Sequence, residues 1–168
     1  LNILGLLDNP TSGQYLLNGT DVSGHTERQR AGLRKQLLGF VFQSFNLIDE
    51  LTVFENVELP LLYLKVPSSD RKKKVEAVLE RMNIMHRRNH FPQQLSGGQQ
   101  QRVAVARALA SKPKFVPADE PTANLDSEAT ENLVEIMDRL HRVENITFIF
   151  ATHDDKVIKY LKRIITLE

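Results

Sequence analysis

Residues Phe115-Val116-Pro117-Ala118-Asp119-Glu120 form a short apolar run that stops at two adjacent carboxylates. A run of this length, bounded by turn residues, is typical of a buried β-strand. Carboxylates at the end of such a strand suit Mg²⁺ and the activation of water, although an acidic pair alone often only caps the next turn. The continuation Pro121-Thr122-Ala123-Asn124-Leu125-Asp126 makes the pattern much more specific.

Helical and strand-like patterns alternate on both sides of this run. The expected strands are residues 14–17, 39–42, 115–118, 145–151 and 163–167. The expected helices are residues 1–7, 27–36, a helical stretch over 51–80, one opened by residues 94–98, one with Leu133, Ile136, Met137 and Leu140 on its core side, and a short one before residue 163. Late strands that alternate with helices predict an α/β fold with a mostly parallel sheet and a helical insert in the middle.

The helical insert shows a clear apolar face. Four residues at helical spacing share it: Val75, Val78, Leu79 and Met82. Asp70 is a suitable N-cap for this helix. The basic run 71–74 falls on the opposite face and is interpreted as a solvated helix surface.

The composition is that of an ordinary globular domain. The 168 residues suffice for one domain with a core, and 41% of them are hydrophobic. The formal net charge of +1 gives no electrostatic reason to expect nucleic-acid binding, and the absence of Cys excludes disulfides and thiolate metal sites. No apolar run is long enough to span a bilayer, so a membrane role would need another chain to supply the span.

The first residue is Leu, and residues 1–7 read as the middle of a helix with no basic start or cleavage site of a signal peptide. We therefore expect the N-terminus to be a break in a longer chain.

Polar side chains follow three of the expected strands directly. Gln43 follows the strand at 39–42, Asp119 and Glu120 follow the apolar run, and His153 follows the strand at 145–151. In an open parallel sheet, ligands bind beyond the carboxyl ends of the strands. We expect these side chains to gather on one rim of the sheet.

The octet Leu95-Ser96-Gly97-Gly98-Gln99-Gln100-Gln101-Arg102 is the most specific single feature. Two glycines let a backbone approach an anion closely, and Ser96 offers a hydroxyl. The helix that follows directs its N-terminal N–H groups and the positive end of its dipole to the same place. A plain Ser/Gly helix cap is the bland alternative.

Several segments together resemble the ATP-binding subunits of ABC transporters. The octet is similar to the signature motif, residues 115–120 to a Walker B strand, Asn124-Leu125-Asp126 to the D-loop, Thr152-His153-Asp154 to the switch-histidine loop, and Phe42-Gln43 to the Q-loop. The resemblance covers essentially the whole chain and implies a P-loop NTPase-type sheet with a helical subdomain at about 44–110, the remainder of 1–168 forming the α/β core. Segments at 45–47, 51–57 and 118–126 resemble the lipoprotein-release and macrolide-exporter branch.

The resemblance also implies roles for individual residues. Asp119 and Gln43 would hold or sense Mg²⁺, Glu120 would activate the attacking water, and His153 would steady the γ-phosphate. ATP would lie between one subunit and the Ser96, Gly97, Gly98 and Gln99 of a second, with Asp126 linking the two sites. The implied partners are a second ATPase subunit, giving a homodimer, and an integral-membrane permease at the cytoplasmic face of the inner membrane; no nucleic acid is implied.

Two features depart from the family pattern. No Gly-x-x-x-x-Gly-Lys-[Ser/Thr] loop occurs, although the family places it just ahead of a helix like residues 1–7. We therefore predict that the 168 residues alone neither bind ATP tightly nor hydrolyse it. Pro117 lies inside the Walker B strand, where it cannot donate to the ladder.

Two other classes of function compete with energy coupling for a transporter. ABC-type ATPases of DNA repair carry longer inserts between the Q-loop and the signature, and those of translation are tandem. A non-catalytic truncated copy would have no reason to keep Asp119, Glu120 and His153 together.

Overall fold

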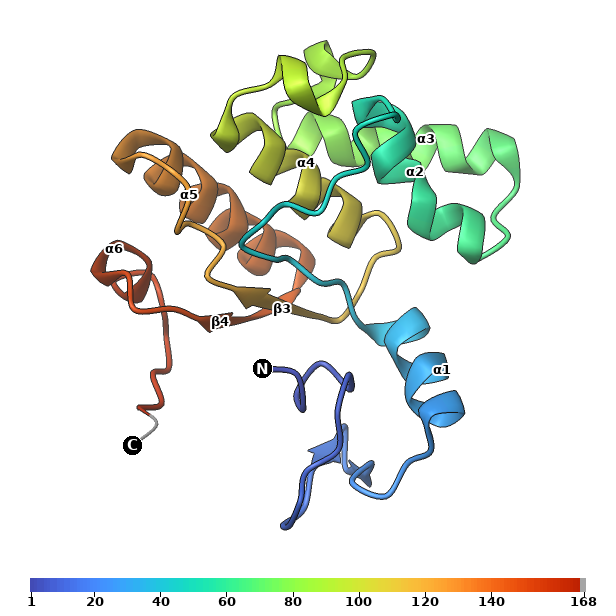
Figure 1. The fold of residues 1–168 in the computed structure, drawn as a ribbon, viewed down its shortest axis with the longest axis vertical. Coiled ribbons are helices and arrows are strands. Elements are labelled where there is room, and N and C mark those ends of the chain that lie inside the picture. Colours follow the sequence, from blue (N-terminus) through green and yellow to red (C-terminus); the bar gives the residue numbers. More distant parts are fainter. Residues whose placement is uncertain (167–168) are drawn as a thin grey trace.

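The computed structural model describes residues 1–166. A small parallel sheet lies at the centre of the molecule. Strand β3 (Phe115–Asp119) pairs in parallel with β4 (Thr147–Ala151), with Phe115 opposite Thr147 and Asp119 opposite Ala151. Helices α2 (Val53–Tyr63), α3 (Ser68–Arg81) and α4 (Gly97–Leu109) gather at one end of the molecule, and the N-terminal hairpin with α1 (Glu27–Leu37) lies at the other (Figure 1). The predicted α/β class is confirmed.

The predicted strand at 39–42 is present only as two isolated parallel bridges to β3, Leu38 to Phe115 and Val41 to Ala118. Its residues still alternate between the two faces of the sheet. Leu38 and Phe40 pack with the N-terminal core cluster, whereas a side chain at Gly39 would meet the Ala108 carbonyl of α4 at 2.2 Å. The segment is therefore held between two packed layers, and it delivers residue 43 to the end of the sheet.

The helical insert consists of α2 (Val53–Tyr63), α3 (Ser68–Arg81) and α4 (Gly97–Leu109), with 3₁₀ turns η1 (Met85–Arg87) and η2 (Pro92–Gln94). The predicted face of α3 is confirmed: Val75, Val78, Leu79 and Met82 are fully buried. The predicted N-cap is wrong: Pro67, with a φ of −55° and an extended ψ of 146°, is the N-cap residue, so the helix begins at Ser68 and Asp70 lies in its first turn. One core cluster joins these helices to β3 and to α5 (Ser127–Glu144).

Two helices follow the strands of the sheet. Helix α5 (Ser127–Glu144) buries Leu133, Met137 and Leu140 as predicted, while Ile136 is only partly buried. It ends at Asn145 in the left-handed conformation, which explains why β4 begins at Thr147 and not at 145. Helix α6 (Asp155–Ile158) is short.

The N-terminal part forms a hairpin of β1 (Leu16–Leu17) and β2 (Thr20–Asp21) around Asn18-Gly19, followed by α1 (Glu27–Leu37). Positive φ at both turn residues is what this pair of residue types favours, so the predicted turn is confirmed.

The predicted helix at 1–7 is wrong. Leu6 has a φ of 58°, and the side chains of Tyr15 and Arg34 donate to the carbonyls of Leu4 and Leu6, so the segment closes into a turn. Residues 163–166 form no strand; residue 167 lies outside the described residues. No helix within residues 1–166 has both the length and the apolar character needed to cross a bilayer.

Pro117 interrupts the ladder between β3 and the segment at 39–41. Val41 N–H donates to the Pro117 carbonyl at 3.0 Å, and Asp119 N–H donates to the Val41 carbonyl at 2.9 Å. In a parallel ladder this register aims the amide of residue 117 at the Gly39 carbonyl, and proline has no N–H to give.

We expect Pro117→Val to raise the free energy of unfolding by about 0.5 kcal/mol, because the regained ladder bond slightly outweighs the lost rigidity of proline in the unfolded chain. Urea unfolding of residues 1–168 measures this. The control is Pro10→Val, which removes a proline from a turn without adding a ladder donor. A Pro117→Val chain no more stable than wild type would contradict the missing-bond explanation.

Candidate functional site

Two of the predicted site residues meet at the carboxyl end of the parallel strands. Glu120 follows β3, and His153 lies two residues beyond β4. The His153 Nδ1–H donates to Glu120 Oε1 at 2.7 Å, which places the proton of a neutral imidazole on Nδ1. The His153 side chain is 88% exposed and that of Glu120 only 25%. The pair leaves the second carboxylate oxygen of Glu120 available to another group.

The backbone of Glu120 is unusual. Its φ is 42°, in the left-handed region that costs a non-glycine residue about 1–2 kcal/mol. Its N–H donates to the Ala151 carbonyl at 2.9 Å, and its own carbonyl accepts from the Ala123 amide at 3.2 Å. Strained residues of this kind persist where the surroundings enforce them, and they gather at functional sites.

Asp119 and Gln43 are both exposed at the same end of the sheet. Asp119 is tied to the segment that leads to Gln43 through its bond to the Val41 carbonyl, and the Gln43 carbonyl accepts from Asn124 Nδ2 at 3.0 Å. Within residues 1–166 no group of three acidic, His or Cys side chains could hold a metal by itself. One carboxylate that shares a metal with phosphate oxygens is the usual arrangement for Mg²⁺, and Asp119 fits it.

The signature-like segment opens α4. Ser96 is the N-cap: its Oγ accepts from the Gln99 amide at 3.3 Å, and Gln99 Oε1 accepts from the Ser96 amide at 3.1 Å. Gly97 and Gly98 thus present their N–H groups at a helix N-terminus, where an anion is favoured. The glycines also have a packing role, because a Cβ at Gly98 would lie 2.9 Å from the Ala129 Cβ of α5.

Asp126 caps the neighbouring helix. Its carboxylate accepts from the Ala129 amide at 2.8 Å at the start of α5. A Cβ at Gly97 would lie 3.4 Å from the Asn124 carbonyl, so the signature-like segment and the loop 124–126 are neighbours. Among the residues described, no hydrogen bond joins Ser96–Gln99 to Glu120 or His153. The described hydrogen bonds thus lie within the Glu120–His153 pair and within the Ser96–Gln99 cap, and none links the two groups.

Two buried polar residues near the site were not singled out in the sequence. Gln101 of α4 is fully buried, and its Nε2 donates to the carbonyls of Pro121, at 2.5 Å, and Phe42, at 3.4 Å. Thr122 is 2% exposed and donates to Asp154 Oδ2 at 3.1 Å. The sequence pattern could have identified Gln101. It is a single polar residue on the apolar face of the helix, four residues before Val105.

The arrangement suits the in-line attack of water on a phosphoryl group. A carboxylate paired with a histidine can orient a water and receive its proton, and a neighbouring carboxylate can hold Mg²⁺. A glycine-rich helix N-terminus elsewhere on the same chain can bind an anion from a second molecule.

Comparison with known proteins identifies the family that the chain resembles. A family model described as "ABC transporter" matches residues 1–123. The chain is 46% identical over 157 residues to the ABC transporter ATP-binding protein YtrE of Bacillus subtilis, covering 94% of this chain and 68% of that protein. It is also 46% identical to the macrolide export ATP-binding/permease protein MacB of Syntrophobacter fumaroxidans, covering 99% of this chain and 24% of MacB.

Among solved structures, the chain resembles the dimeric post-hydrolysis state of the ATP-binding cassette MJ0796 bound to ADP and Pi. The TM-score is 0.84 and the sequence identity 39%, with 95% of this chain and 70% of that chain covered.

Proposed function

The chain belongs to the ABC transporter family as an ATP-binding domain, and we propose that it hydrolyses ATP to drive a separate membrane permease. The observation that carries the hydrolytic role is the bond between His153 and Glu120 at the carboxyl ends of β3 and β4. At this bond a strained backbone and a largely enclosed carboxylate meet at the rim of a parallel sheet, where ligands bind in folds of this class.

The residues of this chain would divide the work as follows. Asp119 and Gln43 hold or sense Mg²⁺, which neutralises charge on the phosphates. Glu120 receives the proton of the attacking water through the carboxylate oxygen that His153 leaves free. His153, fixed by that carboxylate, steadies the terminal phosphate and the water.

The proposed nucleotide site is completed by a second copy of the chain. Ser96, Gly97, Gly98 and Gln99 of one subunit would bind the ATP held at the rim of the other, and Asp126 would connect the two sites. The dimeric cassette found with ADP and Pi supports this. A two-fold homodimer contains two such sites.

The relatives support a permease partner for this chain. MacB is named as a macrolide export protein that combines ATP-binding and permease functions, so we propose a permease partner, a location at the cytoplasmic face of the inner membrane, and a place in the macrolide-export and lipoprotein-release branch. The helices at about 44–110 would form the subdomain that contacts the permease.

Phosphate release in the presence of Mg²⁺ and ATP tests the proposal. We expect turnover by the gene product in which these residues occur, and none by residues 1–168 alone, because that stretch contains no Gly-x-x-x-x-Gly-Lys-[Ser/Thr] loop to bind the β- and γ-phosphates. Turnover by residues 1–168 would refute the second expectation. A gene product without Mg²⁺-dependent ATP turnover would refute the proposed function.

A further inference from the structure

The loop that carries Gln43 contains two successive residues in the left-handed conformation. Phe45 has a φ of 58° and Asn46 a φ of 50°. Each non-glycine residue in this region costs about 1–2 kcal/mol, although Asn tolerates it better than Phe. A pair of them does not persist unless other groups hold the backbone in place.

Arg107 of α4 supplies that hold. Its Nη1 donates to the Asn46 carbonyl at 2.6 Å and its Nη2 to the Phe45 carbonyl at 2.9 Å. Burial lowers the pKa of Arg107. Within residues 1–166 it forms no ion pair with a carboxylate, so its hydrogen bonds go to this loop.

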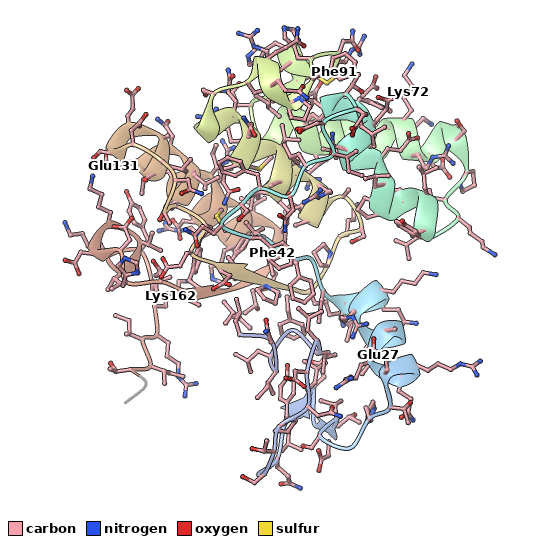
Figure 2. All side chains as sticks on the ribbon, viewed as in Figure 1. Glu27, Phe42, Lys72, Phe91, Glu131 and Lys162 are labelled. Carbon is pink, nitrogen blue, oxygen red and sulfur yellow. The ribbon has the colours of Figure 1, made fainter. Side chains whose placement is uncertain are left out.

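The same loop is held at two further carbonyls. Gln101 donates to the Phe42 carbonyl and Asn124 donates to the Gln43 carbonyl. Four carbonyls over residues 42–46 are thus bound by side chains from α4 and from the loop before α5. Phe42, where the loop begins, lies near the middle of the molecule beside β3 (Figure 2).

We propose that Arg107 is a positioning residue, which clamps the Phe45 and Asn46 carbonyls so that Gln43 stays at the rim beside Asp119 and Glu120. This inference rests on the proposed ATPase function. Because Arg107 and the signature-like segment belong to one helix, the clamp also joins the anion-binding end of α4 to the loop of Gln43. A planar guanidinium can bind two successive carbonyls at once, whereas an ammonium group is a single point charge.

Hydrogen exchange of residues 1–168 tests the clamp without nucleotide. We expect Arg107→Met to speed exchange of the Phe45 and Asn46 amides about tenfold or more, because two charge-assisted bonds are lost. The amide of Ile48, bound to the Asn56 side chain at 2.8 Å, is the internal reference and keeps its rate. Arg107→Lys falls between wild type and Arg107→Met.

The matched control is Arg81→Met. Arg81 is also a partly buried arginine, and it pairs with Glu144 far from this loop, so its loss destabilises the fold without freeing Phe45 or Asn46. Equal exchange of these amides in the Arg107→Met and Arg81→Met chains would overturn the clamp.

The catalytic consequence is measured in the gene product. We expect Arg107→Met to lower kcat about tenfold, to keep the KM for ATP within about twofold, and to raise the Mg²⁺ concentration needed for half-maximal rate. An unchanged kcat would overturn the positioning role. A wild-type protein without ATP turnover would refute the proposed function instead, and the exchange comparison would still decide whether Arg107 holds the loop.

Discussion

Glu120→Gln is expected to lower ATP hydrolysis by the gene product about 10²- to 10⁴-fold, the range that general base catalysis contributes. The amide has the size of the carboxylate but cannot receive the proton of water. Its Oε1 can still accept from His153 Nδ1–H, whose present bond is 2.7 Å long, so the geometry of the rim is kept. Phosphate release under saturating Mg²⁺ and ATP is the measurement.

The control for this change is Glu131→Gln on α5. It removes the same charge from an exposed position outside the predicted site, and the rate should stay near that of wild type. ATP binding to the Glu120→Gln protein should persist, because the lost group acts on water and not on the nucleotide. A Glu120→Gln protein that retained more than about a tenth of the wild-type rate would exclude Glu120 as the base.

Gln101→Glu is expected to lower the free energy of unfolding by about 3–5 kcal/mol at neutral pH. The change places a carboxylate in a fully buried position that now donates to the carbonyls of Pro121 and Phe42. The new carboxylate and the carbonyls of Pro121 and Phe42 would then be three hydrogen-bond acceptors in contact, with no donor among them. Urea unfolding of residues 1–168 gives the magnitude, with Gln100→Glu on the adjoining, partly exposed position as the control.

The same variant has a defined pH dependence. Burial without a cation raises the pKa of the new carboxyl group in the folded state, so the penalty is present above the folded-state pKa and shrinks as the pH falls. The protonated group can also donate to one of the two carbonyls. A penalty that stayed constant down to about pH 4, near the unfolded pKa of Glu, would contradict the burial of Gln101 between these carbonyls.

The contact between Glu120 and His153 was predictable from the sequence for a simple reason. Each strand at the sheet rim is a short apolar run with a polar residue directly behind it, and parallel pairing brings such ends together. The observed register, with Asp119 opposite Ala151, is the one that places Glu120 and His153 in contact. The apolar faces of α3 and α5 were predictable for the same reason, because spacing alone determines which residues share a face.

Other features depended on contacts that no local pattern contains. The residue pattern at 1–7 predicts a helix, yet the segment forms a turn. The side chains of Tyr15 and Arg34 donate hydrogen bonds to the carbonyls of Leu4 and Leu6 in this turn. Phe45 and Glu120 adopt left-handed conformations and are hydrogen-bonded to residues far along the chain, Arg107 and Ala151. Spacing likewise cannot tell whether the signature-like segment meets Glu120 in its own subunit or in a partner.

Subunit complementation tests most directly whether the nucleotide site is shared between two chains. Glu120→Gln disables the rim, and Gly97→Asp disables the anion-binding helix end by adding a carboxylate that α4 itself tolerates at its N-terminus. Each homodimer then has two defective sites, whereas a mixed dimer has one site with both changes and one intact site. We predict that an equimolar mixture, allowed to exchange subunits, recovers about a quarter of the wild-type ATPase rate, since half of the dimers carry one working site. A mixture no more active than the two variants alone would contradict the shared site.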